Sequence, residues 1–229
     1  MAKPNSGQGI VWQGTEADDV YTGTAGADSL GGRGGNDRID GGAGNDTING
    51  HDGNDVLTGG TGNDRIGGNE GNDNISGGDG DDYLAGQEGD DVVDGGAGND
   101  FIGAGPGRDV LTGGLGADQF FFTANFDAGM NIRTITDFSR AQGDYIDLRS
   151  IDADGIASNN PRKGGNTDYV VTNGPSPLPG TAWLEPFTDP LTGATGVSIY
   201  LNSDADADPD DRIDVLGVTS LTWGVDILG

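Results

Sequence analysis

Between residues 14 and 121 the hydrophobic positions follow a nonapeptide period. Each nonapeptide has six places rich in Gly, Asn and Asp, followed by three places that carry one apolar side chain at place eight. Twelve copies follow one another without a gap, and such short, sustained self-similarity is typical of solenoid folds. The residues at place eight are Tyr21, Leu30, Ile39, Ile48, Leu57, Ile66, Ile75, Leu84, Val93, Ile102, Leu111 and Phe120.

The polar places of the nonapeptide are as regular as the apolar one. Place six is Asp in all twelve copies, and place four is Gly in every copy except the first, which has Ala17. Gly and Asn adopt positive φ at little cost and therefore favour turns. Places seven to nine alternate outward, inward and outward, as in a very short strand. Each copy therefore predicts one turn followed by one short strand with its apolar residue in the core.

A second period, twice as long as the nonapeptide, underlies the first. Place two is a larger residue in alternate copies, as at Thr15, Arg33, His51, Asn69 and Gln87, and is Gly in five of the intervening copies, at Gly42, Gly60, Gly78, Gly96 and Gly114. This alternation predicts a structural turn built from two nonapeptides, with successive copies on opposite edges of the solenoid. The segment Gly105-Pro106 interrupts the alternation near the end of the repeats.

Composition indicates that the repeats need a cation to fold. The 229 residues carry a net charge of −27 and include 46 Gly, while only 32% are hydrophobic. Low hydrophobicity with high net charge is typical of disordered chains, and each Gly loses much backbone entropy when it is ordered. The acidic charge also disfavours nucleic acid and anionic membranes as partners. There is no apolar run long enough to span a bilayer.

The repeat offers the ligands that Ca²⁺ prefers. Turns stacked about 4.8 Å apart would present carboxylates and backbone carbonyls together, and hard oxygen ligands suit calcium. Zinc would need Cys or His, but the chain has no Cys and one His. The alternative is that the Asp residues only form Asx-turns, which Asn would do equally well, yet Asn never occurs at place six.

Six turns on each edge leave five gaps per edge, so we expect up to about ten ions and a chain that folds on binding them. The candidate side-chain ligands are Asp19, Asp28, Asp37, Asp46, Asp55, Asp64, Asp73, Asp82, Asp91, Asp100, Asp109 and Asp118. The candidate backbone-carbonyl ligands are Gly26, Gly35, Gly44, Gly53, Gly62, Gly71, Gly80, Gly89, Gly98 and Gly107.

The copy GGAGNDTIN at residues 41–49 resembles the nonapeptide G-G-x-G-x-D-x-U-x of RTX (repeats-in-toxin) proteins. The resemblance covers the twelve copies of residues 14–121. It implies an all-β fold, a parallel β-roll with calcium in both rows of turns. It also implies a bacterial protein that a type I secretion system exports and that folds outside the cell. Residues 1–13 lack the hydrophobic region of a signal peptide, in keeping with that route.

Residues 1–13 and 122–229 are expected to cover the two ends of the roll. We expect Trp12 to cover the first end. Alternating β-branched residues predict strands at 131–138, 144–151, 196–204 and 211–218. The order of these segments resembles the region that follows the repeats in serralysin-type proteases. That resemblance implies a β-sandwich-like cap and an uncleaved C-terminal secretion signal ending in VDILG at 225–229.

One acidic loop lies inside the C-terminal region. Asp204, Asp206 and Asp208 have the spacing of an EF-hand, but Pro209 replaces its Gly and Val215 its bidentate Glu. A solvated acidic turn and an additional weak calcium site both remain open for the loop 204–211.

We expect no enzyme within this chain. The zinc-protease motif H-E-x-x-H is absent, and the single histidine, His51, lies at place two of a repeat. A glycosidase built on paired carboxylates is not excluded by the number of carboxylates, but the preferred interpretation assigns the repeat Asp residues to calcium.

Two further functions remain open, and we expect a monomer. The chain resembles the RTX modules appended to alginate epimerases and adhesins, which bind polysaccharides or surfaces, and also the export module of a larger RTX hydrolase or toxin. Outward apolar pairs at Tyr83/Phe101 and Val92/Val110 indicate either a partner surface or contact with the C-terminal region.

Overall fold

The computed structural model describes residues 7–122, 131–148, 170–171, 181–188, 192–202, 211–222 and 227–228. All regular elements in these residues are strands. The first thirteen are β1 Val11–Gln13, β2 Val20–Thr22, β3 Ser29–Gly34, β4 Arg38–Ala43, β5 Thr47–Asp52, β6 Val56–Thr61, β7 Arg65–Glu70, β8 Asn74–Asp79, β9 Tyr83–Glu88, β10 Val92–Ala97, β11 Phe101–Ala104, β12 Arg108–Leu115 and β13 Gln119–Phe122. The last seven are β14 Asn131–Ile135, β15 Tyr145–Asp147, β16 Val170–Val171, β17 Thr181–Thr188, β18 Thr195–Asn202, β19 Asp211–Leu216 and β20 Ile227–Leu228.

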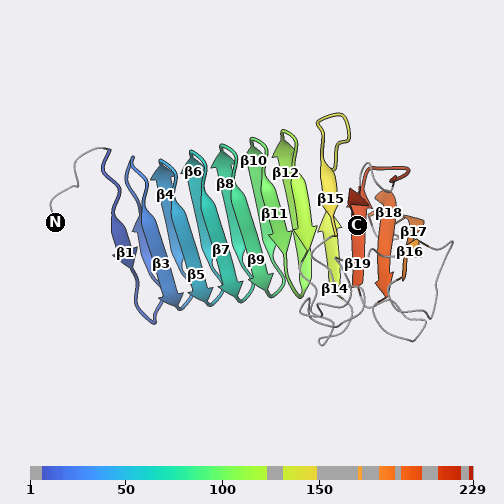
Figure 1. Cartoon of the computed structure of the whole chain (residues 1–229). Coiled ribbons are helices and arrows are strands. Elements are labelled where there is room, and N and C mark those ends of the chain that lie inside the picture. The colour runs from blue at the N-terminus through green and yellow to red at the C-terminus, as the bar shows by residue number, and fades with distance from the viewer. Residues whose placement is uncertain are drawn as a thin grey trace, which may run out of the picture.

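The repeats form two sheets that run side by side along the molecule (Figure 1). Odd-numbered strands β1 to β13 form one sheet, and even-numbered strands β2 to β12 form the other. Neighbouring strands are parallel and offset by two nonapeptides, as in the pairing of Ile48 with Ile66. This register confirms the parallel β-roll and its turn of two nonapeptides.

The C-terminal strands lengthen the same two sheets. Strands β15 and β20 continue the sheet that ends at β13, and β14, β19, β18, β17 and β16 continue the sheet that ends at β12. Strands β17, β18 and β19 pair antiparallel. The four strands that the sequence predicts in this region are present as β14, β15, β18 and β19, whereas β17 was missed. A separate β-sandwich stays a prediction.

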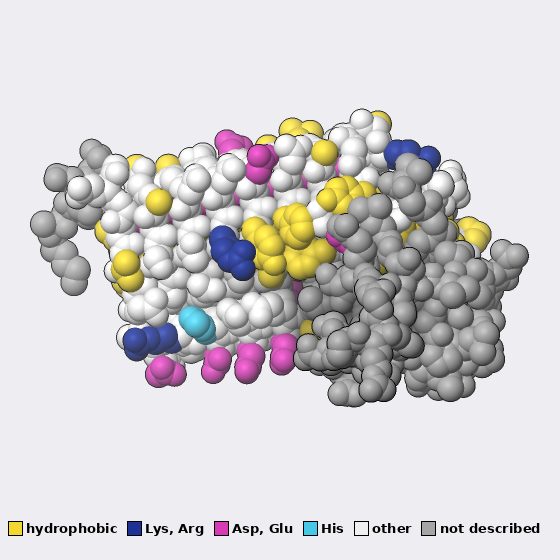
Figure 2. Space-filling view, in the orientation of Figure 1, with side chains coloured by type: hydrophobic (Ala, Val, Ile, Leu, Met, Phe, Trp, Pro, Cys, Tyr) yellow, Lys and Arg dark blue, Asp and Glu magenta, His cyan; other side chains and the backbone are white. Residues whose placement is uncertain are grey.

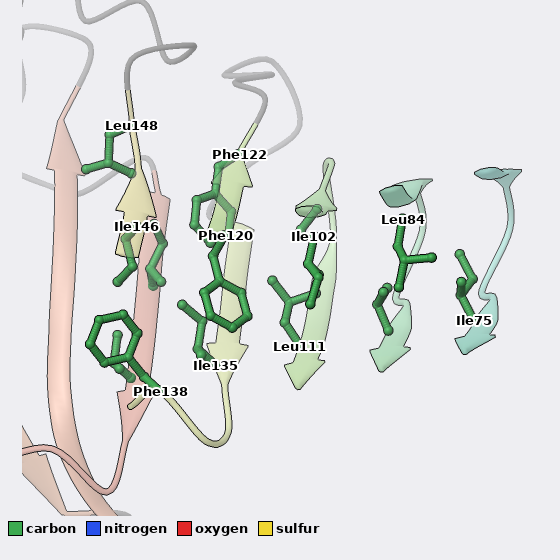
Figure 3. Packing of buried hydrophobic residues seen from close by; sticks show 14 of the residues in the cluster. Ile75, Leu84, Ile102, Leu111, Phe120, Phe122, Ile135, Phe138, Ile146 and Leu148 are labelled. Carbon is green, nitrogen blue, oxygen red and sulfur yellow. The ribbon is translucent and has the colours of Figure 1, made fainter. Parts of the chain in front are cut away.

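The residues at place eight form a single hydrophobic row between the sheets. From Leu30 to Phe120 they are at most 1% exposed, and Phe122, Ile135 and Ile146 extend the row beyond the repeats (Figure 3). At the first end Tyr21 is only partly buried, and the Trp12 ring stacks on it with centroids 4.3 Å apart. Each turn therefore adds two apolar side chains to the core.

In nine of the twelve copies, on both edges of the roll, the backbone at place two is left-handed. On one edge Gly occupies it, as at Gly60 with φ of 113°. On the other edge non-glycine residues hold this conformation, which costs an L-residue about 1–2 kcal/mol. These residues are Arg33, His51, Asn69 and Gln87, with φ of 84°, 78°, 85° and 80°. The alternation at place two in the sequence therefore distinguishes two edges that share one backbone geometry.

Candidate calcium sites

The roll gathers the Asp residues of place six into two rows, one along each edge. All except Asp19 are buried, although each lies directly before a strand or, at Asp109, at the beginning of one. A buried carboxylate needs a compensating partner for each of its oxygens. The two oxygens of these side chains have different surroundings.

The first oxygen, Oδ1, has a structural role. The backbone N–H of Asp46 donates to Asp64 Oδ1 at 2.7 Å, and the N–H of Asp64 donates to Asp82 Oδ1 at 2.7 Å. The same donation links every neighbouring pair along both rows, so each side chain is fixed to the turn before it. An Asn side chain could accept this hydrogen bond as well, and Oδ1 alone therefore does not require Asp.

The second oxygen, Oδ2, distinguishes Asp from Asn. In ten of the twelve residues it is buried and accepts no hydrogen bond. Leaving a buried charged group unsatisfied costs more than about 1–3 kcal/mol, so each of these oxygens requires a cation. The ten residues are Asp37, Asp46, Asp55, Asp64, Asp73, Asp82, Asp91, Asp100, Asp109 and Asp118.

The first residue of each row is the exception. The backbone N–H of Thr15 donates to Asp19 Oδ2 at 2.7 Å, and that of Thr24 donates to Asp28 Oδ2 at 2.6 Å. These two carboxylates are satisfied within their own turns, so each row begins with a carboxylate that needs no metal. Asp19 and Asp28 are thus the weakest candidates among the twelve predicted ligands.

The glycine at place one lies against the free oxygen in every one of the ten copies except that of Asp109, where place one is Ala104. A Cβ atom on Gly59 would lie within 3.0 Å of both Asp64 Oδ2 and the carbonyl oxygen of Gly77 in the next turn. The same arrangement recurs at Gly41 and Gly77. A carboxylate oxygen and a carbonyl oxygen therefore converge beside a bare Cα atom, and this donor set suits calcium. The place-one carbonyls were missed from the sequence because Gly there also serves the turn.

The predicted place-four carbonyls also point along the stack. A Cβ atom on Gly62, which has φ of 119°, would collide with the carbonyl oxygen of Gly44 in the preceding turn. Within the described residues no three His, Cys, Asp or Glu side chains form a metal cluster. Two carboxylates per gap therefore leave the remaining ligands of an ion to backbone carbonyls and water.

Burial makes these carboxyl groups hard to ionise. Desolvation raises the pKa of Asp73, Asp100 and Asp109 to about 7, although the hydrogen bond from the preceding turn acts in the opposite direction. Desolvation likewise raises the pKa of Asp64 and Asp82 to about 6. Near neutral pH the ionised rows thus oppose folding unless a cation accompanies them.

The rows continue past the repeats in ways that the nonapeptide pattern does not predict. On one edge the N–H of Asp118 donates to Asp144 Oδ1 at 3.0 Å, so Asp144 takes the position of a further place-six residue. Its Oδ2 accepts from the N–H of Ser139 at 2.7 Å. The signal in the sequence is weak, because only Asp144 and Ile146 keep their places in an otherwise altered nonapeptide. On the other edge Arg133 pairs with Asp109.

The structure corrects one interpretation and leaves others outside its described residues. Asp211 is not part of a solvated turn, because it begins β19, is fully buried and lies 3.0 Å from Arg133. Asp204, Asp206, Asp208 and Asp210 lie outside the described residues, as do residues 225, 226 and 229 of the terminal VDILG. Within that segment Ile227 is buried and pairs with Ile146.

His51 is exposed at the surface and belongs to the left-handed row at place two. Its neighbours in the register are Arg33 and Asn69. In the described part of the chain there is no helix long and apolar enough to cross a membrane.

The chain forms a β-roll whose stacked turns present buried carboxylate oxygens. This combination is typical of calcium-binding repeat solenoids. Comparison with known families supports this assignment. The family described as the RTX calcium-binding nonapeptide repeat matches four segments of the chain, residues 13–48, 31–66, 67–102 and 104–127. The chain therefore carries RTX calcium-binding nonapeptide repeats.

Comparison with individual proteins adds little beyond the repeat. No curated protein matches the chain. Among solved structures it is similar to the solution structure of the AlgE6R3 subunit from the Azotobacter vinelandii mannuronan C5-epimerase. That match has 24% sequence identity and a TM-score of 0.34, and it covers 77% of this chain and 80% of that one.

Proposed function

We propose that this chain is a secreted, non-catalytic calcium-binding protein whose roll folds when several Ca²⁺ ions bind outside the cell. The observation that carries the proposal is the set of ten buried Oδ2 atoms without hydrogen-bond partners. Five of them lie on each edge, which equals the number of gaps between six stacked turns. Neither the hydrogen bonds between neighbouring turns nor the hydrophobic core supplies a partner for these oxygens. The roll therefore needs cations along its whole length.

Each Asp of the rows would then serve two functions through its two oxygens. Oδ1 keeps neighbouring turns in register, as in the 2.7 Å bond from Asp46 N–H to Asp64 Oδ1. Oδ2 and the nearby carbonyls bind calcium, which compensates the buried negative charge. Because the ligands of one ion come from successive turns, binding and stacking of the turns are one event. We therefore expect cooperative folding with calcium.

The test is far-UV circular dichroism of the full chain with and without millimolar calcium. We expect β-structure to appear only with calcium, and magnesium at the same concentration to be much less effective because it demands stricter geometry. A fully β spectrum in the presence of a chelator would refute calcium-dependent folding.

The export part of the proposal rests on the C-terminal sequence. We propose that the last residues, which end in Ile227-Leu228-Gly229, carry a type I secretion signal. Deletion from Asp226 onward should abolish export through a type I apparatus, whereas deletion of residues 2–5 should leave it unchanged. To separate export from folding, the cellular and external fractions are both assayed for calcium-dependent folding. Normal export of the C-terminal deletion would contradict this role.

A second candidate function, binding of an extracellular polysaccharide or a cell surface, is favoured by one groove. On the outer face of the odd-numbered sheet the Tyr83 and Phe101 rings stack with centroids 5.6 Å apart, and Phe121 lies 4.9 Å from Phe101. The Arg65 guanidinium covers the far face of Tyr83 at 4.2 Å. Figure 2 shows hydrophobic side chains gathered beside a basic one on this face.

Tyr83 and Phe121 of this aromatic row line a groove of about 290 Å³, and the Phe101 ring contacts both of them. Small residues such as Gly67 and Ala85 line the groove, together with the polar side chains of Asn49 and Gln87. Apolar surface beside a few convergent polar groups is the usual composition of a ligand site. Sugar rings have apolar faces and hydrogen-bonding hydroxyl groups, so a glycan chain suits this lining.

The groove is tested with a double variant, Tyr83→Ala with Phe101→Ala, in calcium. We expect weaker binding to immobilised glycans than in wild type. The matched control is Val92→Ala with Val110→Ala, which removes exposed apolar side chains from the other sheet. Equal binding by both double variants would remove the groove as a binding site, whereas calcium-dependent folding would be unaffected.

A further inference from the structure

Arg133 is the largest fully buried side chain among the described residues. It lies in β14 at the position that pairs with Asp109 in β12. One turn and two turns earlier in the same row, Asp91 and Asp73 hold the corresponding position. A guanidinium group therefore stands where the next carboxylate of this row would be.

The guanidinium is surrounded by oxygen atoms of the kinds that line the calcium gaps. Its Nη1 lies 3.0 Å from Asp211 Oδ1, and its Nε lies 3.9 Å from Asp109 Oδ2. Nε and Nη2 also donate to the carbonyl oxygen of Gly105 at 3.1 and 2.7 Å. Two carboxylates and one backbone carbonyl thus face a single positive charge.

The last repeat of this row is altered where it meets Arg133. Place one is Ala104, a buried residue with a methyl group where every other copy has Gly. Place two is Gly105, which does not share the left-handed conformation of Gln87 one turn earlier and instead directs its carbonyl to Arg133. The interruption of the place-two alternation at Gly105-Pro106 therefore coincides with the end of this row.

We propose that Arg133 supplies, as part of the chain, the positive charge that calcium supplies in the earlier gaps of this row. The gap after Asp109 then holds no ion and is neutralised without metal. The other edge differs, because there Asp118 Oδ2 is followed by the carboxylate of Asp144. That edge would bind one ion more than the edge that ends at Arg133. This inference rests on calcium binding by the repeats.

The test compares Arg133→Ala and Arg133→Lys with wild type in the full chain. Native mass spectrometry counts the bound calcium ions, and circular dichroism follows folding during a calcium titration. We expect Arg133→Ala to bind one ion more than wild type, because removal of the guanidinium leaves the oxygens of Asp109, Asp211 and Gly105 around a space. Arg133→Lys retains the charge and should bind the wild-type number. Arg108→Ala, which removes an exposed charge beside Asp109, is the control and should also bind the wild-type number.

Two results would overturn the inference. One is an unchanged number of ions in Arg133→Ala, which would make Arg133 an ordinary structural ion pair. The other is failure of Arg133→Ala to fold at about 10 mM calcium, roughly tenfold above the weakest extracellular sites. Wild-type protein that binds no calcium would instead refute the proposed function itself. The two failures are thus distinguishable in one set of samples.

Discussion

Replacement of Asp73 by Asn separates the two functions of the carboxylate in the middle of a row. Asn keeps the oxygen that accepts the N–H of Asp55, a bond of 2.8 Å. It replaces Oδ2, which is buried without a hydrogen-bond partner, by an uncharged amide nitrogen. The substitution therefore preserves the ladder of hydrogen bonds and removes one charged calcium ligand.

Asp73→Asn is expected to stabilise the roll without calcium and to destabilise it with calcium. Burial raises the pKa of Asp73 from 3.8 to about 7. At 1.36 kcal/mol per pKa unit, the ionised group disfavours the metal-free roll by on the order of 4 kcal/mol above pH 7. Asn removes this cost. With calcium, the weaker binding of the ion outweighs this gain in stability. Changes in residues that only support a metal ligand already weaken metal binding about 10- to 100-fold. Asp73 borders two gaps, each with two carboxylates, so its replacement removes a ligand from two ions. A loss of at least about 100-fold at each is about 2.7 kcal/mol per ion, and about 5 kcal/mol for the two exceeds the gain of about 4 kcal/mol.

The assay is thermal unfolding at pH 7.5 in saturating calcium, together with a calcium titration followed by circular dichroism. We expect Asp73→Asn to unfold at a lower temperature and to need more calcium for folding. Asp79→Asn, which removes an exposed carboxylate from a neighbouring turn, should behave as wild type. Equal calcium dependence in Asp73→Asn and wild type would show that the row is only a hydrogen-bond ladder.

Three further outcomes are expected. Without calcium, the roll should gain stability as the pH falls from about 8 to 5. Burial raises the pKa values of the row carboxyl groups, so the folded state binds more protons in this range than the unfolded chain. Circular dichroism at both pH values checks this. Ile66→Ala should lower the free energy of unfolding of the calcium-loaded roll by about 2–5 kcal/mol in a urea titration, since Ile66 is buried in the core row. Gly78→Ala should destabilise far more than Gly193→Ala by the same measurement, because both have positive φ but only at Gly78 would a Cβ meet a neighbouring turn. Similar losses at the two glycines would contradict the packing argument.

The repeats were predictable because the residues of each nonapeptide determine its local structure. Gly44 indicates a turn, Asp46 indicates a position at an edge of the roll, and Ile48 indicates a position in the core. Repetition of this pattern in twelve copies determines the roll. The alternation at place two predicts the register, and the pairing of Ile48 with Ile66 confirms it.

The missed residues depend on contacts between distant segments. Arg133 in β14 reaches Asp211 in β19, and neither residue sits in a repeated pattern. Asp144 takes its place in a row only because β15 pairs with β13. Strand β17 was missed because its sequence, TAWLEPFT, includes a proline and lacks strict alternation. Local chemistry therefore determines the repeats, whereas long-range pairing determines how they end.

The residue type at place two alternates between the two edges, so each turn of the roll consists of a pair of nonapeptides. From Arg33 to Gly96, a nonapeptide with Gly at that place belongs to one edge, and one with a larger residue belongs to the other, while β14 and β15 attach the end of the chain to different sheets. Insertion of a single nonapeptide would move every later copy to the opposite edge and would bring Arg133 to the wrong row. Insertion of two would leave every later residue on its own edge. The molecule can therefore grow or shorten only by pairs of nonapeptides, and its length is counted in whole turns.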